Sequence, residues 1–305
     1  MFAITGITGS VGGQVARALL ARGQVVRAVM RNPDKAQVWS RHGCEIALAA
    51  LNNAKALEAA FRRASGVFIL LPPNAGDPSF AAEREYITAI EEALLATRPA
   101  KVVCLSTIGA QSPHPNILDR LGMMEAAFSD LPMPVAFLRA AWFVENTARD
   151  FETARTMGVL KSFLQPLDHP FPMVGAADIG RVAADLLLED WTGLRVVEVE
   201  GPQRVSPNDL AAYLGDVFGR SVRAEAVPRA AWEQIFRAQG PADPFPRMQM
   251  LDGFNEGWIR FEDGGAHSLK GMVSARDVLI ELAGRARRRA PHGPGLLADF
   301  PVLGG

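Results

Sequence analysis

Residues 5–12 read TGITGSVG, and this short stretch decides the fold that we predict for the chain. It follows an apolar run, Phe2–Thr5, with the composition of a buried strand. It leads into Val11–Arg22, whose apolar residues recur at helical spacing. Three glycines recur at every third position: Gly6, Gly9 and Gly12. A glycine-rich turn between a first strand and a first helix predicts the start of a dinucleotide-binding βαβ unit.

The glycine turn has the features that a pyrophosphate group needs. Glycines allow a tight turn and a close approach of the backbone to the ligand, while amides at the helix N-terminus face the phosphates. The hydroxyls of Thr8 and Ser10 can donate hydrogen bonds to the same oxygens. The cofactor-binding residues predicted in this turn are Gly6, Thr8, Gly9, Ser10, Val11 and Gly12.

The end of the second predicted strand, Val25–Met30, indicates which dinucleotide is bound. An acidic residue at this place would accept a hydrogen bond from the free 2′-hydroxyl of NAD. The chain has Arg31 instead, followed by Asn32 and Lys35. Because a guanidinium suits a 2′-phosphate, we predict that these residues bind NADP(H) in preference to NAD(H).

The first half of the chain alternates β-rich runs with longer segments of helical period, which predicts repeated βα units. We therefore predict an α/β fold with a Rossmann-type, doubly wound parallel sheet over residues 1–150. Past residue 150 this alternation ends, which predicts a smaller α+β substrate-binding domain over 151–284. We expect residues 172–190, which contain an amphipathic helix, to pack back on the first domain. Residues 285–305 are predicted to form a flexible tail.

The charge and the apolar pattern limit the classes of partner. Lysine and arginine (32) nearly balance aspartate and glutamate (33), so the net charge gives no reason to expect a nucleic acid or a membrane surface. No apolar stretch reaches the ~18 residues of a membrane span, and the N-terminus lacks a secretory pattern. Cys44 and Cys104 lie in apolar runs and are expected to be buried thiols. We therefore expect a cytoplasmic protein.

Several segments, in order, resemble the NmrA-like proteins, an atypical branch of the short-chain dehydrogenase/reductase superfamily. That branch includes isoflavone-reductase-like enzymes and NAD(P)H:quinone reductases. Besides the opening TGITGSVGGQVARALLARG, the matching segments are VFILLPP, KVVCLSTIGA, FLRAAWFVEN, ADIGRVAADLL and EGPQRVSPNDLAAYLGDVFGRSV. The resemblance implies further cofactor contacts at Leu71, Pro72, Pro73, Ser106 and Thr107. It also implies a substrate pocket walled by Trp142, Phe143 and Asn146.

The chain departs from the catalytic patterns of this superfamily. Conventional members use a Tyr-x-x-x-Lys pair, but neither Tyr86 nor Tyr213 has a lysine four residues later. Many members of the branch carry a lysine or a histidine shortly before the glutamate that corresponds to Glu125. Leu121 and Gly122 stand at that place here. The usual general acids of the superfamily are therefore missing.

A second departure concerns the adenine. The family's usual aspartate after the third strand is replaced by Ala50, and Asn52 or Asn53 is the alternative contact.

The remaining catalytic candidates are His114, on a loop after the fifth predicted strand, and Asn146. For His114 an ordinary exposed loop histidine is the alternative. The histidines lack the short spacings of a metal site, so we predict no metal.

These patterns predict an NADPH-dependent oxidoreductase that reduces a quinone or another planar enone or carbonyl compound without a Tyr-x-x-x-Lys pair. After hydride transfer, a reduced quinone can take its protons from water, so this reaction depends least on the missing acids. The alternative is a non-catalytic NADP(H)-binding redox sensor that acts through a protein partner. The sequence does not decide which substrate is bound, nor whether the protein forms a homo-oligomer.

Overall fold

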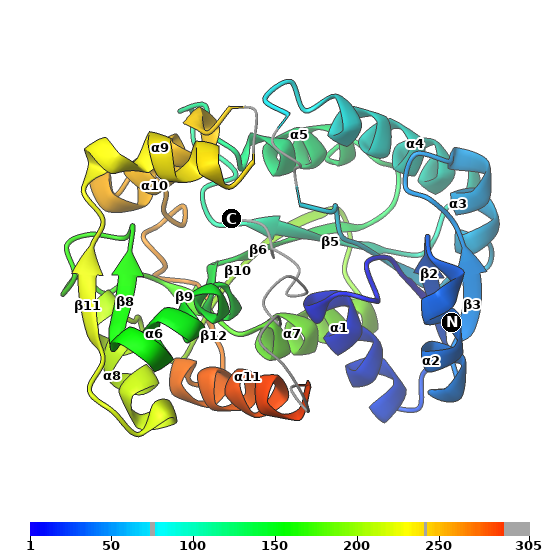
Figure 1. The fold of residues 1–305 in the computed structure, drawn as a ribbon. Coiled ribbons are helices and arrows are strands. Elements are labelled where there is room, and N and C mark those ends of the chain that lie inside the picture. The colour runs from blue at the N-terminus through cyan, green and yellow to red at the C-terminus, as the bar shows by residue number, and fades with distance from the viewer. Residues whose placement is uncertain (74–76, 241–242, 290–305) are drawn as a thin grey trace.

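A single sheet of eight strands forms the centre of the molecule, with helices on both of its faces (Figure 1). The computed structural model describes residues 1–73, 77–240 and 243–289. The strand order is β12-β10-β6-β5-β4-β1-β2-β3, and the neighbouring strands are parallel. The strands of this sheet are β1 (Phe2–Ile4), β2 (Val26–Met30), β3 (Glu45–Leu48), β4 (Gly66–Ile69), β5 (Val102–Thr107), β6 (Val135–Ala140), β10 (Leu194–Glu200) and β12 (Leu269–Lys270). The predicted Rossmann-type α/β fold is confirmed.

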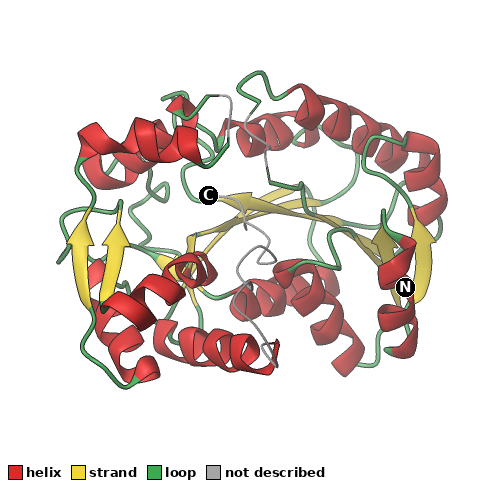
Figure 2. Cartoon of the chain, in the orientation of Figure 1, coloured by secondary structure: helices red, strands yellow, loops and turns green. Residues whose placement is uncertain are grey.

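Helices α3, α4 and α5 cover one face of the sheet, and α1 and α7 cover the other, as Figure 2 shows in the same orientation. The helices of the first half are α1 (Ser10–Ala21), η1 (Pro33–Lys35), α2 (Ala36–Arg41), α3 (Ala54–Phe61), α4 (Ala81–Thr97) and α5 (Asp119–Phe128). Successive residues of a strand point to opposite faces, so the sheet separates two hydrophobic clusters. Phe68 of β4 packs with α1 and α7, whereas Val67 and Ile69 pack under the other layer.

Helix α7 (Ala176–Leu188) packs closely against α1. A Cβ atom at Gly180 would lie 2.4 Å from the Cβ of Gln14, so only glycine allows the two helices to approach this far. The buried carboxylate of Asp178 accepts hydrogen bonds from the amides of Met272 and Val273, at 2.9 Å each. Helix α7 therefore joins the first half of the chain to the segment that follows β12.

The structure differs from the predicted domain boundary at residue 150. Strand β10 pairs with β6, from Leu194 beside Val135 to Val199 beside Ala140, and β12 pairs with β10. Residues within 151–284 therefore extend the main sheet. The alternating pattern of β10 predicts a strand, but such a pattern does not specify the partner strand, which only the tertiary fold selects.

The remaining elements form a smaller group beside the C-terminal ends of β5 and β6 (Figure 1). It contains two small parallel sheets, in which β7 (Trp142–Phe143) pairs with β9 (Met173–Val174) and β8 (Val159–Ser162) pairs with β11 (Arg223–Ala226). Its helices are η2 (Val144–Asp150), α6 (Phe151–Met157), α8 (Pro207–Phe218), η3 (Arg229–Ala231), α9 (Trp232–Ala238) and α10 (Phe245–Glu256).

The C-terminal segment begins as a helix rather than as the predicted flexible tail. Helix α11 spans Ala275–Arg289 and so includes residues 285–289. The physical reason is that arginine and alanine favour helix, which lets the basic run continue an amphipathic helix. The rest of the predicted tail, residues 290–305, lies outside the described residues. Among the described helices, none is long and apolar enough to cross a membrane.

Candidate functional site

The glycine turn between β1 and α1 is held by short-range contacts that need glycine. Gly6 has a φ angle of +61°, in the left-handed region, and its carbonyl accepts a hydrogen bond from the amide of Gly9 at 2.9 Å. A Cβ atom at Gly12 would lie 2.4 Å from the same carbonyl oxygen. The hydroxyl of Thr5 accepts a hydrogen bond from the amide of Leu70 at 2.9 Å, which ties the turn to the end of β4.

The turn fits the pyrophosphate of a dinucleotide. Ser10, Val11 and Gly12 form the first turn of α1, where amides have no acceptor within the helix and the helix dipole favours an anion. At Gly9 a Cβ atom would meet only the carbonyl oxygen of Gly6 within 4 Å, so its outer side is open to a ligand. Thr8 is exposed beside it, whereas the side chain of Val11 is buried and only its backbone is available.

Arg31, Asn32 and Lys35 lie exposed at the carboxyl end of β2, the strand next to β1. Neither Arg31 nor Lys35 forms an ion pair within the described parts of the chain, so both cations are available to an anionic ligand. The carbonyl oxygen of the Asn32 side chain accepts a hydrogen bond from the amide of Asp34 at 2.8 Å and caps η1. Asn32 therefore already has a structural role.

The two asparagines suggested for the adenine differ in the structure. The side chain of Asn53 accepts a hydrogen bond from the amide of Ala56 at 3.0 Å and caps α3. Asn52 is exposed. Because the Asn53 side chain caps α3, the side chain of Asn52 is the more available of the two for a contact with adenine.

The segment after β4 is held in place by a buried arginine that the sequence analysis did not single out. Arg120, on α5, donates a hydrogen bond from Nη1 to the carbonyl oxygen of Pro72 at 2.9 Å. Burial lowers the pKa of Arg120 to about 10, although the charge of Glu83 acts in the opposite direction. Leu71 is buried and Pro73 is exposed. Helix α5 thus holds the segments at the carboxyl ends of both β4 and β5 in place.

A buried network of charges lies behind the carboxyl end of β5. Ser106 donates a hydrogen bond to Oε1 of Glu125 at 2.5 Å, and Thr107 is buried beside it. Arg139, on β6, donates to both carboxylate oxygens of Glu125, at 2.9 and 2.6 Å. Its Nη1 also donates to Glu262 at 2.5 Å. Burial alone would lower the pKa of Arg139, but these carboxylates outweigh it and raise the pKa, so the guanidinium stays charged.

Sequence reasoning missed this network, although one signal was present. Arg139 is the single charged residue in the strand VAFLRA, and a charge in a buried strand requires partners. Glu262 is 123 residues away from Arg139, so no local pattern links the two.

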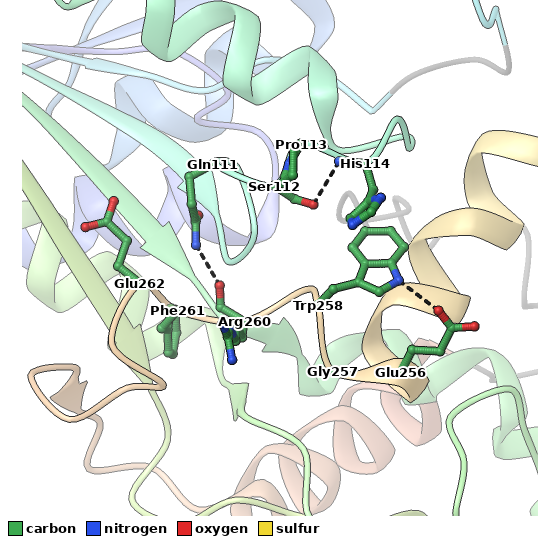
Figure 3. Close-up of a pocket in the computed structure, with 10 residues that line it drawn as sticks. All are labelled: Gln111, Ser112, Pro113, His114, Glu256, Gly257, Trp258, Arg260, Phe261 and Glu262. Carbon is green, nitrogen blue, oxygen red and sulfur yellow. Dashed lines mark hydrogen bonds between the residues drawn. The ribbon is translucent and has the colours of Figure 1, made fainter.

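His114 lines a cavity of about 480 Å³ between the loop after β5 and the segment after α10 (Figure 3). Its ring lies 4.8 Å from the ring of Trp258, centroid to centroid. The side-chain amide of Gln111 donates to the carbonyl oxygen of Arg260 at 2.8 Å, which holds the two walls together. Glu262 belongs to the same wall, so the cavity is connected to the Arg139 network.

The predicted substrate wall is separate from that cavity. Trp142, Phe143 and Asn146 are absent from the residues that line it. Trp142 is half buried and meets the ring of Phe254 edge to face at 5.3 Å, while Phe143 is buried in the core. Asn146 is half buried in η2. These residues stay candidates for a substrate wall, on the α10 side of the strand ends.

The positions at which the usual acids are missing are closed by packing. Leu121 is buried in the hydrophobic cluster under α5. A Cβ atom at Gly122 would lie 2.8 Å from the carbonyl oxygen of Ala110, so no side chain fits there without a shift of the backbone. Tyr86 lies on α4, and Tyr213 lies on α8 with its hydroxyl bonded to Gln203. Among the described residues, no cluster of three or more metal ligands is present.

The fold and the glycine turn at the strand ends define a dinucleotide-binding protein of the Rossmann type, and its reductase relatives make it an NAD(P)H-dependent oxidoreductase. A model of the NmrA-like family matches residues 1–256. The chain therefore belongs to the NmrA-like family.

Its curated relatives are reductases. The chain is 30% identical over 243 residues to a (4-alkanoyl-5-oxo-2,5-dihydrofuran-3-yl)methyl phosphate reductase of Streptomyces griseus, covering 79% of this chain and 82% of that protein. It is 27% identical to the NAD(P)H azoreductase of Xenophilus azovorans, covering 84% of this chain and 85% of that protein.

Solved structures share the fold. An NADPH-dependent quinone oxidoreductase of Escherichia coli superimposes with a TM-score of 0.74 at 21% identity, covering 92% of this chain and 99% of that chain. The Citrobacter triphenylmethane reductase complexed with NADP(H) gives a TM-score of 0.76 at 20% identity, covering the same shares.

Proposed function

We propose that this protein binds NADPH in preference to NADH and reduces a quinone or another planar enone or carbonyl compound. The observation that carries the proposal is the open glycine turn at the N-terminus of α1, with the unpaired Arg31 at the end of the neighbouring strand. A pyrophosphate suits the first feature and a 2′-phosphate suits the second. Arg31 and Lys35 then select the phosphorylated cofactor.

The remaining predicted residues have roles along the strand ends. Leu71, Pro72 and Pro73 border the path from the adenine ribose to the nicotinamide, and Arg120 holds their backbone. Ser106 and Thr107, at the carboxyl end of β5, would lie under a bound nicotinamide. The network of Glu125 and Arg139 orients the Ser106 hydroxyl, because that hydroxyl donates to a carboxylate that two guanidinium nitrogens already hold. Trp142, Phe143 and Asn146 form the wall against which a planar substrate lies.

The kind of hydride acceptor that we propose follows from the absence of the superfamily's usual general acids. The bound nicotinamide supplies a hydride, and a reduced quinone can take its proton from water. Leu121 and Gly122 provide no proton, and neither tyrosine has its lysine partner. The acceptors named for the relatives, a dihydrofuranone phosphate, an azo compound and a quinone, support a conjugated acceptor.

Calorimetric titration with NADPH and with NADH, on one protein sample, tests the cofactor half of the proposal. The loss of nicotinamide absorbance with a small panel of quinones and enones then tests the reaction. Tight NADPH binding with turnover supports the reductase. Tight binding without turnover favours the second candidate, a redox sensor, which the packed and acid-free positions Leu121 and Gly122 support. Absence of NADPH binding contradicts both.

A further inference from the structure

Close contacts fix the two walls of the cavity at His114. A Cβ atom at Gly109, whose φ angle is +77°, would lie 2.8 Å from Cγ2 of Ile259. Only glycine therefore lets the segment after α10 approach the loop after β5 this closely. The bond from the Gln111 side chain to the carbonyl oxygen of Arg260, at 2.8 Å, joins the same two segments. The two walls thus have a fixed spacing.

Trp258 gives this cavity a rigid aromatic surface. A Cβ atom at Gly253 would lie 2.6 Å from Cη2 and Cζ3 of Trp258, so the indole rests directly on the backbone of α10. Its Nε1 donates a hydrogen bond to Oε2 of Glu256 at 3.0 Å (Figure 3). The ring of His114 lies 4.8 Å away, tilted by 48°. The indole is half buried and lines a cavity of about 480 Å³, which suits a planar aromatic ligand.

Carboxylates outnumber permanent cations around the cavity. Glu256 and Glu262 line it, whereas Arg260 is the one permanent cation among its described lining residues. The cation behind Glu262 is shared, since Arg139 pairs with three carboxylates at 2.6, 3.9 and 2.5 Å: Glu125, Glu198 and Glu262. Burial raises the pKa of Glu198, yet the other two carboxylates still share one guanidinium. The wall at Glu262 therefore retains negative charge.

We propose that this cavity binds a planar aromatic cation, a ring system that carries a quaternary or protonated nitrogen. The ring stacks on Trp258, because the face of an indole attracts a positive charge. Glu256, beside the indole nitrogen, and Glu262 complement that charge, and Arg260 opposes it.

This ligand site goes beyond the proposed function, because it is separate from the predicted substrate wall. Trp142, Phe143 and Asn146 do not line the cavity. Binding at the cavity can therefore be measured whether or not the protein reduces a quinone.

Calorimetric titration at pH 8 with N-methylquinolinium and with quinoline tests the site, because the two probes share one ring system and differ in charge. The whole protein is titrated with and without NADP⁺. The wild type is expected to bind the cation about tenfold more tightly than quinoline, with or without NADP⁺. Equal or weaker binding of the cation overturns the proposal. Loss of binding when NADP⁺ is added also overturns it, since the probe would then lie in the cofactor site.

Two exposed residues of the cavity should shift the affinity in opposite directions. Glu256→Gln keeps an acceptor for the indole but loses the charge, so affinity for the cation should fall about threefold. Arg260→Gln should raise it about threefold, and the backbone bond to Gln111 remains. Affinity for quinoline should stay the same in both variants. Unchanged affinity for the cation, or shifts of the same sign, overturn the proposal.

Glu233→Gln is the matched control for charge, because Glu233 is an exposed carboxylate of α9 that pairs with Arg237. It should leave the affinity for both probes unchanged. A loss as large as that in Glu256→Gln would assign the effect to the charge of the whole protein and overturn the site.

Trp258→Leu removes the aromatic surface and should weaken both probes about tenfold. Trp191→Leu is its matched control, because Trp191 is also half buried but lies beside Lys101 and Arg195, away from the cavity. If Trp258→Leu does not fold, the exposed Glu256 and Arg260 variants decide. Weakening of the cation by Asn146→Ala, with none in Glu256→Gln, would place the probe at the substrate wall and overturn the proposal.

Discussion

The cofactor side and the substrate side of this molecule are encoded over different distances in the sequence. In the glycine turn, Gly6 contacts Gly9 and Gly12 within one stretch of eight residues, and a bond from Leu70 to Thr5 ties the turn to β4. On the substrate side, Arg139 bonds to Glu262 across 123 residues and Gln111 bonds to Arg260 across 149. The first region can be recognised from a motif, whereas the second exists only after the chain has folded.

The largest effect is expected where the two regions meet. Arg139→Met leaves the Glu125 carboxylate buried without its partner, which should lower the free energy of unfolding by about 3–5 kcal/mol. Urea unfolding at neutral pH measures it. Arg195→Met is the control, because Arg195 is a half-buried partner of the exposed Glu189, and its loss should cost about 1 kcal/mol. Similar small losses in both variants would mean that the long-range network does not stabilise the contact between the two regions.

Gly12→Ala tests the local side of the comparison. The new Cβ atom would lie 2.4 Å from the carbonyl oxygen of Gly6, so the turn must shift. We expect a loss of about 1–3 kcal/mol in stability, together with a clear loss of NADPH affinity. Gly23→Ala is the matched control, because Gly23 lies just past the other end of α1 and has open space around it. Its φ angle of +71° should cost about 1 kcal/mol and leave NADPH affinity unchanged. Wild-type affinity in Gly12→Ala would show that the turn does not hold the cofactor.

Arg31→Ala sharpens the comparison within the cofactor side. If Arg31 binds the 2′-phosphate, its removal should weaken NADPH binding by about tenfold or more and leave NADH binding nearly unchanged. Calorimetry with both cofactors measures the difference. Arg41→Ala, which removes an exposed arginine at the end of α2, serves as the control. Equal weakening of both cofactors would remove Arg31 from its proposed role.

Asp150→Asn should produce an effect on stability whose size depends on pH. The folded state holds the Asp150 proton up to a pKa of about 7, above the ordinary value of an unfolded aspartate. Between these two values the folded state binds more protons, so this group makes stability fall as pH rises towards 7. The asparagine variant should therefore be more stable than the wild type at pH 8, by up to about 4 kcal/mol for a shift of this size, and should gain almost nothing at pH 4. Thermal unfolding at both pH values measures the gain.

Asp130→Asn replaces an exposed aspartate and should show no such difference. A gain for Asp150→Asn that is the same at both pH values would contradict the raised pKa.

The positions of the early elements could be predicted because each has a local signal. The predicted strand at Val25–Met30 corresponds to β2 at Val26–Met30, and the predicted helix at Val11–Arg22 corresponds to α1 at Ser10–Ala21. The role of β10 could not be predicted in this way. Its valines favour a strand, but the sequence does not specify β6 as the partner.

The residues of the candidate site also differ in this way: some have a local signal in the sequence, and others come together only in the folded chain. His114 could be named as a polar loop residue after β5, but its neighbour Trp258 comes from a segment more than a hundred residues later.

The sequence by itself determined the Rossmann-type fold, the glycine turn and the cation at the end of β2, because these depend on contacts within a few residues and on hydrophobic periodicity. The tertiary structure alone decided that β10 and β12 extend the sheet, and that Glu125, Arg139 and Glu262 share one charge network. The physical reason is that ion pairs and cavities form between side chains that the chain brings together from distant positions, and no local pattern records that proximity.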